Sequence, residues 1–130
     1  MFTREHVRTH AWHEARAFSS AVRVTGGSLV FLAGMSPVDE QRRLVGLGDF
    51  DRQVAQVWEN MRLAIEKAGG TMTDIVTMTV FLTDMRHGNR FIELRRQQFG
   101  RDFPASALIG IDQLAVPGML IEIQAVAAIP

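Results

Sequence analysis

The chain has 130 residues, enough for one domain with its own core, and its 14 basic and 14 acidic side chains cancel at neutral pH. A net charge of zero provides no general attraction to nucleic acid or to an anionic membrane, so binding either would need a local basic patch. The absence of cysteine excludes disulfides, thiolate metal sites and a cysteine nucleophile. We therefore expect a single domain over residues 1–130, without a linker or an internal repeat.

The N-terminal residues are polar. Arg4 and Arg8 precede any apolar run, which is the wrong order for a signal peptide, and nowhere do about 18 apolar residues follow one another. We therefore expect a cytoplasmic protein with no membrane partner. His6, His10 and His13 have the spacing of one helix face, but no acidic residue or helix signal supports a metal site there. A polar N-terminal segment of this kind is more often frayed than metal-binding. We therefore expect no metal and no cofactor.

The first two predicted strands cover residues 21–24 and 28–32, which are both β-prone. They are separated by Thr25, Gly26 and Gly27, and paired glycines allow the positive φ angles that a tight hairpin turn requires. The pattern predicts an antiparallel hairpin.

A helix with one buried face is predicted next, because apolar residues recur at three- and four-residue steps from Phe50 to Ala68. Asp49 can cap its first turn by accepting backbone N–H groups. Gly69 and Gly70 can end it in a left-handed conformation that other residues avoid.

Residues 75–82 are rich in β-branched side chains and apolar on both alternating faces, which predicts a strand in the interior of a sheet. Residues 86–99 predict a second helix with weaker periodicity, in which Arg95 and Arg96 are exposed. Gly100 ends this helix.

Residues 105–111 and 120–129 predict two more strands, separated by a loop that contains Pro117 and Gly118. The resulting order is β-β-α-β-α-β-β. It indicates an α+β sandwich in which two helices pack on one face of a mixed sheet.

Six segments carry a family resemblance. They are Arg16–Val22, Leu32–Met35, Glu59–Met61, Thr79–Met85, Phe103–Ile111 and Met119–Ala127. On these residues the chain resembles the YjgF/RidA family of small enamine/imine deaminase-like proteins. The resemblance implies a chorismate-mutase-like fold that assembles as a homotrimer, with the open sheet faces packed together and a cleft at each subunit boundary.

Glu122 interrupts an apolar strand, where a carboxylate is costly unless it is paired. Strand alternation places Glu122 and Gln124 on one face, toward a cleft or an interface. The resemblance implies that Glu122 positions the hydrolytic water, and partial desolvation would raise its pKa toward that of a general base. The alternative is an ordinary strand position that faces an interface or solvent.

Ser106 stands where the resemblance implies an arginine that holds the substrate carboxylate, and a hydroxyl cannot replace a guanidinium fork. Leu108 and Phe18 stand where the family's deaminases often have cysteine and tyrosine, so this wall of the cleft is more apolar. Arg16 or Arg101 could supply a substitute cation if either reaches across the subunit boundary.

Further substrate-binding positions follow from the resemblance. Ala33 and Gly34 lie in a turn of small residues where the backbone can approach a ligand closely, although Gly34 could serve the turn alone. Backbone donors near Ala107 and Leu108 can stabilise developing charge. Phe18 could equally be a core residue.

Three functions are compatible with these residues. We favour a hydrolase that acts on the carbon–nitrogen bond of a small enamine, imine or related intermediate, with a substrate less acidic or more apolar than a simple imino acid. The alternative is a trimeric small-molecule-binding protein that keeps the cleft without the chemistry. An endoribonuclease or translation inhibitor is least favoured, because the net charge is zero and aromatic platforms are few.

Overall fold

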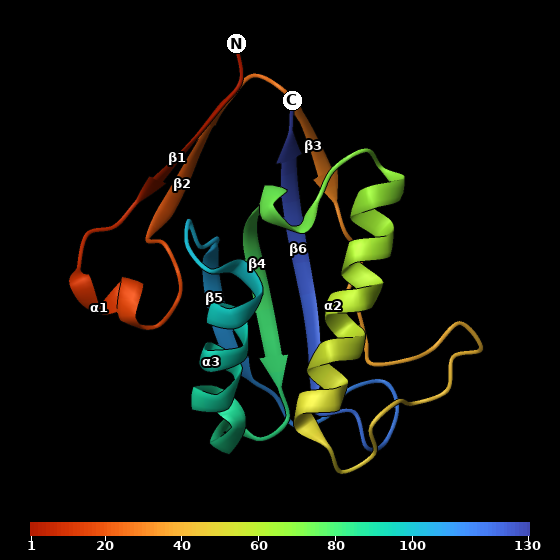
Figure 1. Cartoon of the computed structure of the whole chain (residues 1–130). Helices are drawn as coiled ribbons and strands as arrows, with labels where there is room; N and C mark the ends of the chain where they lie inside the picture. Colours follow the sequence, from red (N-terminus) through yellow and green to blue (C-terminus); the bar gives the residue numbers. More distant parts are fainter.

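Four strands form a mixed sheet in the order β3-β6-β4-β5 in the computed structural model, which describes residues 1–130 (Figure 1). The strands are β3 (Ser28–Phe31), β4 (Ile75–Leu82), β5 (Ala105–Gly110) and β6 (Ile121–Ile129). β4 runs parallel to β5 and antiparallel to β6, and β6 is antiparallel to β3. The interior position predicted for residues 75–82 is therefore confirmed.

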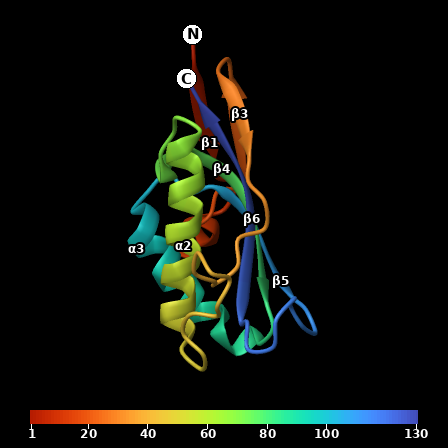
Figure 2. The ribbon, with the colours of Figure 1, turned by 90° about the vertical axis from the view of Figure 1, so that its right-hand side faces the viewer.

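Two helices, α2 (Phe50–Lys67) and α3 (Gly88–Phe99), cover one face of this sheet (Figure 2). Short 3-10 turns, η1 (Met72–Asp74) and η2 (Met85–His87), precede β4 and α3 respectively. The α+β class with both helices on one face is confirmed. No helix combines the length and the hydropathy needed to span a bilayer.

The ends of α2 follow the local signals in the sequence. The side chain of Asp49 accepts a 3.1 Å hydrogen bond from the backbone N–H of Arg52, which satisfies one of the free donors of the first turn. At the other end Gly69 has a φ of 96°, in the left-handed region. The buried stripe between these ends packs on the sheet and consists of Phe50, Gln53, Val54, Val57, Met61 and Ile65.

The N-terminal segment differs from the prediction. Residues expected to be frayed form a strand, β1 (Thr3–Val7), and a short helix, α1 (Ala11–Ala15). β2 (Ala21–Thr25) pairs antiparallel with β1, whereas β3 pairs with β6. The predicted hairpin between residues 21–24 and 28–32 is therefore wrong, and β1 and β2 form a ribbon that diverges from the main sheet (Figure 1).

The two glycines between β2 and β3 explain this geometry. Gly26 and Gly27 do adopt positive φ angles, 73° and 74°, but the chain opens there and does not fold back on itself. A Cβ on Gly26 would lie 2.1 Å from the carbonyl oxygen of Met1, so the N-terminus passes directly against the turn. β1 thereby supplies the pairing for β2 that the hairpin would have supplied.

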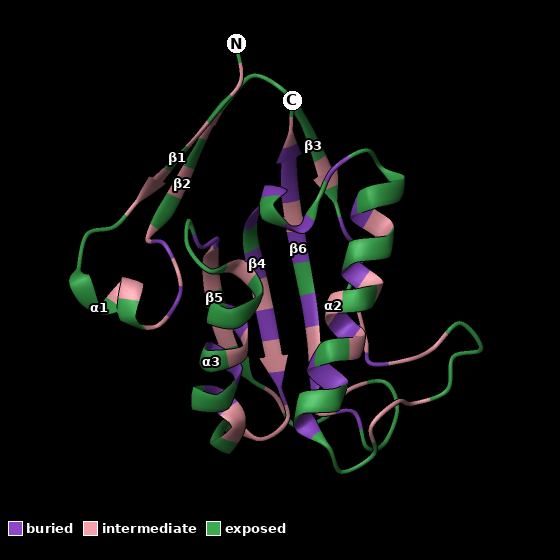
Figure 3. Ribbon diagram, viewed as in Figure 1, coloured by how far each residue is buried: buried purple, intermediate pink, exposed green.

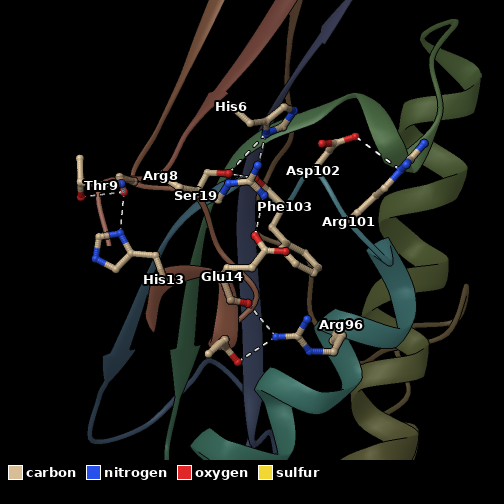
Figure 4. A network of polar contacts seen from close by, with 12 residues as sticks. His6, Arg8, Thr9, His13, Glu14, Ser19, Arg96, Arg101, Asp102 and Phe103 are labelled. Carbon is tan, nitrogen blue, oxygen red and sulfur yellow. Dashed lines mark hydrogen bonds and ion pairs between the residues drawn. The ribbon is translucent and has the colours of Figure 1, made fainter. Parts of the chain in front are cut away.

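The ribbon and α1 rest against β5 and α3 through polar contacts (Figure 4). The backbone N–H of Ser19 donates to the carbonyl oxygen of Pro104 at 3.0 Å, and its hydroxyl donates to that of Phe103 at 2.5 Å. Arg96 donates to the carbonyl oxygens of Glu14 and Ala15 at 2.7 and 2.8 Å. These bonds hold the segment between α1 and β2 beside the first residues of β5.

Neither helix covers the opposite face of the sheet, which the turn after β3 reaches beside Glu122 (Figure 2). Buried and more exposed residues alternate along β6 (Figure 3). Strand alternation places the more exposed set on this open face. Phe31 is 74% exposed and Ile109 is 40% exposed, while Phe81 and Val126 are half-buried. The open face therefore presents aromatic and aliphatic side chains.

Candidate functional site

Arg95 is buried, contrary to the sequence prediction, with only 1% of the residue exposed. It follows Phe91 and Ile92 by four and three residues, so it lies on the stripe of α3 that faces the sheet. Its Nη1 donates to the hydroxyl of Ser106 at 2.5 Å, and its Nη2 donates to the carbonyl oxygen of Arg16 at 3.2 Å. The guanidinium carbon also lies 5.1 Å from the centre of the Phe91 ring.

A cavity of about 180 Å³ lies beside this guanidinium, and we call it the Arg95 pocket. Its lining residues are Trp12, Arg16, Phe18, Ile92, Arg95, Ser106 and Leu108. The structure thus brings together three of the predicted binding residues, Phe18, Ser106 and Leu108. Arg16 lies at the same cavity, whereas Arg101 lines a different cavity of about 670 Å³ beside β1.

The two arginines of the Arg95 pocket have no acidic partner. None of the ion pairs in the chain includes Arg16 or Arg95. The Nε of Arg95 is buried and makes no hydrogen bond. Burial, with a smaller contribution from the positive charge of Arg16, lowers the pKa of Arg95 to about 10. The pocket is therefore electropositive.

Glu122 lies half-buried on the open face of the sheet, next to the turn after β3. Ser36 donates a 2.9 Å hydrogen bond to its Oε1. Met35 and Ile123 exchange backbone hydrogen bonds of 2.7 and 3.1 Å, which holds the turn against β6. As a result a Cβ on Gly34 would lie only 2.5 Å from Oε2 of Glu122, and Gly34 and its neighbour Ala33 are both exposed.

The two parts of the predicted site lie on opposite faces of the sheet. Ser106 pairs with Met78, whose side chain is buried beneath the helices. Glu122 pairs with Phe81, on the open face. Ala107 is exposed, shares that face and is not among the residues that line the Arg95 pocket. One chain alone therefore does not bring Glu122 to Ser106.

A profile of the family described as "Endoribonuclease L-PSP" matches residues 8–129. The chain belongs to this family, the YjgF/RidA family. It is 32% identical over 110 residues to a RutC family protein of Pyrococcus abyssi, covering 85% of this chain and 84% of that protein. It is also 32% identical over 110 residues to Protein DfrA of Myxococcus xanthus, covering 85% and 83% of the two chains.

Two solved structures of Rid and YjgF proteins resemble the fold. YyfB of Yersinia pestis, described as a protein of unknown function of the conserved Rid family, superposes with a TM-score of 0.90 at 27% identity, covering 97% of this chain and 98% of YyfB. Rv2704 of Mycobacterium tuberculosis, a YjgF/YER057c/UK114 family member, gives a TM-score of 0.69 at 27% identity, covering 98% and 100%. The family fold is therefore shown over nearly the whole chain.

The rings of His10 and His13 in this YjgF/RidA-family chain lie 5.2 Å apart, centre to centre, but His6 makes its contacts elsewhere. His6 lies in β1, and its Nδ1 is 3.0 Å from the carbonyl oxygen of Phe103. The Nδ1 of His13, in α1, is 2.5 Å from the hydroxyl of Ser20, and His10 precedes α1. No group of three histidine, aspartate or glutamate side chains is arranged to hold a metal ion.

Sequence reasoning missed Arg95 and Trp12 as candidate site residues of this family member. Arg95 was recognisable by position, because it shares the helix stripe of Phe91 and Ile92, but charged residues are rarely buried fully and its side-chain type suggested exposure. Trp12 carried no such signal, since its place depends on the contacts of α1 with α3.

Proposed function

We propose that this chain is a hydrolase of a small enamine or imine, with an active site formed by two copies. Glu122 of one copy would face the Arg95 pocket of the next. The observation that carries this proposal is the placement of Glu122 and Ser106 on opposite faces of one sheet, because the family resemblance assigns both residues to a single cleft. Only a second copy can bring them together.

The open face supports self-association as a homotrimer. Its exposed apolar side chains, Phe31 and Ile109, lie on the same face as Glu122, and an aromatic ring that is 74% exposed is costly in water. Burial of this face against other copies would remove these rings from solvent. It would also carry Glu122 to a subunit boundary.

The proposed reaction needs only water as co-reactant. Glu122 accepts a proton from water as the water oxygen attacks the carbon of the C=N bond, and the resulting carbinolamine then releases ammonia as the C=O bond forms. Glu122 passes this first proton to the nitrogen as the carbinolamine forms, and then passes the hydroxyl proton of the carbinolamine to the leaving nitrogen, so one imine and one water give one carbonyl compound and one ammonia. An enamine enters after it tautomerises to the imine.

Two features of the chain would assist this reaction. The hydrogen bond from Ser36 fixes the orientation of the Glu122 carboxylate, so that its other oxygen, Oε2, can meet the water. β5 is an edge strand, so alternate backbone N–H groups along it have no sheet partner. Near Ala107 and Leu108 these groups can donate to developing negative charge.

The second candidate function is a binding protein without chemistry. It is favoured by the apolar residues of the Arg95 pocket, since Phe18, Ile92 and Leu108 offer no hydroxyl or amide to a reacting group. Such a protein would keep its ligand affinity unchanged in Glu122→Gln. The hydrolase would lose turnover in the same variant.

A mixing experiment tests the two-copy site. Glu122→Gln removes the base, and Ser106→Phe fills the Arg95 pocket, so each variant alone should release no ammonia from freshly generated imines of 2-oxo acids. If the variants are refolded together at equal concentration, about a quarter of the boundaries should combine an intact Glu122 with an intact pocket. Ammonia release near a quarter of the wild-type rate is expected.

Either of two outcomes would overturn the proposal. Full activity of Glu122→Gln would remove the carboxylate from the mechanism. Absence of recovery in a mixture shown to contain mixed oligomers would exclude a site shared between copies.

A further inference from the structure

The Arg95 pocket contains a cation whose surroundings are unusual for a buried charge. Arg95 is 1% exposed, yet its hydrogen-bond partners are a neutral hydroxyl and a neutral carbonyl oxygen. Its Nε makes no hydrogen bond at all. Burial of a charge without an opposite charge is strongly unfavourable, so a retained buried guanidinium points to an anion that binds against it.

A second positive charge reinforces this arrangement. Arg16 lines the same cavity and carries no ion pair, and its own carbonyl oxygen accepts a bond from Arg95. The acidic residue nearest in sequence, Glu14, is already paired with Arg8 at 2.7 Å. The chain therefore offers this pocket two guanidinium groups and no carboxylate.

The remaining walls limit the class of anion. Trp12, Phe18, Ile92 and Leu108 make more than half of the lining apolar, and Ser106 is the only neutral polar side chain. A volume of about 180 Å³ is too small for a nucleotide. A carboxylate matches the planar fork of arginine, whereas a phosphate would leave additional acceptor oxygens against apolar walls.

We infer that the Arg95 pocket binds a small monocarboxylate with a short apolar tail, with Arg95 as the carboxylate-holding residue and Arg16 as a second cation. The cation thus comes from α3, in place of the arginine that the family resemblance puts at Ser106 on β5. This reverses the sequence expectation of a less acidic ligand. The inference rests on the proposed function only in treating this ligand as the substrate, since binding itself requires no turnover.

Trp12 supplies a direct probe of binding. The other tryptophan, Trp58, lies on α2 and packs between Phe91 and Phe99, so Trp58→Phe leaves Trp12 as the only indole in the chain. In this background we would titrate butyrate at constant ionic strength and follow the fluorescence. Butyramide, the neutral compound of the same shape, and inorganic phosphate serve as comparison ligands.

Butyrate should give a saturable change in fluorescence, and butyramide and phosphate should give none in the same concentration range. Arg95→Met should weaken butyrate binding at least tenfold, or about 1.4 kcal/mol, because a charged two-point contact is lost. Arg101→Gln removes the same charge from an exposed position outside the pocket and should leave the midpoint unchanged. Equal responses to butyrate and butyramide, or an unchanged midpoint in Arg95→Met, would overturn the inference.

A double variant keeps the test informative if Arg95→Met folds poorly. Arg95→Met combined with Ser106→Arg moves the guanidinium from α3 to β5 within the same pocket, and it should recover butyrate binding to within about threefold of wild type. Arg16→Gln, at a half-buried position, should weaken binding less than Arg95→Met does. If all three variants bind butyrate as tightly as wild type does, neither arginine holds the anion.

The same titration in Glu122→Gln separates this inference from the proposed function. Unchanged butyrate affinity in Glu122→Gln, together with no imine hydrolysis by the wild-type chain, would refute the hydrolase and keep the anion pocket. Imine hydrolysis with a KM that is unaffected by Arg95→Met would refute the anion pocket and keep the hydrolase.

Discussion

Gly34 lies directly against the carboxylate of Glu122. A Cβ added to Gly34 would be only 2.5 Å from Oε2 and 3.1 Å from Cδ of Glu122. The backbone of Gly34 does not require glycine through a positive φ, because its φ is outside the left-handed region. The close approach to Glu122 is therefore the reason that a larger residue would be disfavoured here.

Gly34→Ala is expected to displace the Glu122 carboxylate from its hydrogen bond with Ser36 and to lower imine turnover at least tenfold. The thermal midpoint should change little, because Gly34 and Glu122 are not in the core and the carboxylate can rotate toward solvent. Steady-state ammonia release and thermal unfolding check both parts. Undiminished turnover in a well-folded Gly34→Ala would show that the position of this carboxylate does not matter.

Gln53 is the polar residue on the buried stripe of α2 and is fully buried. Its amide donates to the carbonyl oxygens of Gly46 and Gly118 at 3.0 and 2.9 Å, and it accepts from the backbone N–H of Leu120 at 2.8 Å. The side chain thus joins α2 to the loops that precede α2 and β6.

Gln53→Met keeps the size of this side chain but removes its three hydrogen bonds to the backbone groups of Gly46, Gly118 and Leu120. We expect a loss of about 3 kcal/mol in the free energy of unfolding, measured by urea titration. The matched control is Gln97→Met on the exposed face of α3, which should stay within about 0.5 kcal/mol of wild type. Similar losses in the two variants would mean that the Gln53 network contributes little.

Gly26 and Gly48 allow a comparison at equal φ. Gly26 and Gly48 both have a φ of 73°, but a Cβ on Gly26 would meet the Met1 carbonyl, whereas a Cβ on Gly48 meets nothing within 4 Å. Gly48→Ala should cost about 1 kcal/mol for the left-handed conformation alone. Gly26→Ala should cost at least about 1 kcal/mol more, unless β1 detaches.

Thermal unfolding of the two variants gives this difference, and hydrogen exchange of β1 reports detachment. Equal midpoints with unchanged protection of β1 would contradict the observed path of the N-terminus past Gly26.

The stability of the fold should depend on pH through the carboxylate of Asp84. Hydrogen bonds from the side chain and the backbone N–H of Arg86 lower the pKa of Asp84 to about 2. Because the folded pKa lies below the ordinary value of about 3.9, the contribution to stability is present above about pH 4 and is lost as the pH falls toward 2. Asp84→Asn should therefore lower the thermal midpoint at pH 6, with a difference from wild type that shrinks as the pH falls through this range. A difference that is constant with pH would show that the charge of Asp84 is not involved.

The parts of the fold that the sequence predicts well depend on local chemistry. The apolar period of α2, its Asp49 cap and the glycines at its end are all contained in one segment, and alternation alone places Glu122 and Gln124 on one face. The β1–β2 ribbon could not be predicted in this way. Its pairing partner is a polar strand, and its position depends on distant contacts such as those of Ser19 with Phe103 and Pro104.

The residues of the candidate site likewise divide into those that the sequence could predict and one that depends on tertiary packing. Phe18, Ser106 and Leu108 could be assigned from the family resemblance and do line one pocket. Arg95 could not be assigned with them, because its burial results from the orientation of α3 on the sheet. The apparent absence of a cation at Ser106 was therefore a property of one position and not of the whole pocket.

The open face predicts a dependence of activity on assembly. Phe31 is 74% exposed in the single chain, so Phe31→Asp removes little buried area and should leave the fold of each copy intact. In the proposed oligomer the same substitution buries an unpaired carboxylate at the interface, which costs several kcal/mol per copy. Light scattering should then report monomers, and ammonia release should fall to background because Glu122 and the Arg95 pocket no longer meet.

Arg23→Asp is the matched control, since it places the same residue on the β1–β2 ribbon, away from the open face, and should leave assembly unchanged. If Phe31→Asp gives monomers with full turnover, the site is contained in one chain, and the opposite placement of Glu122 and Ser106 would then require a mechanism that does not combine them.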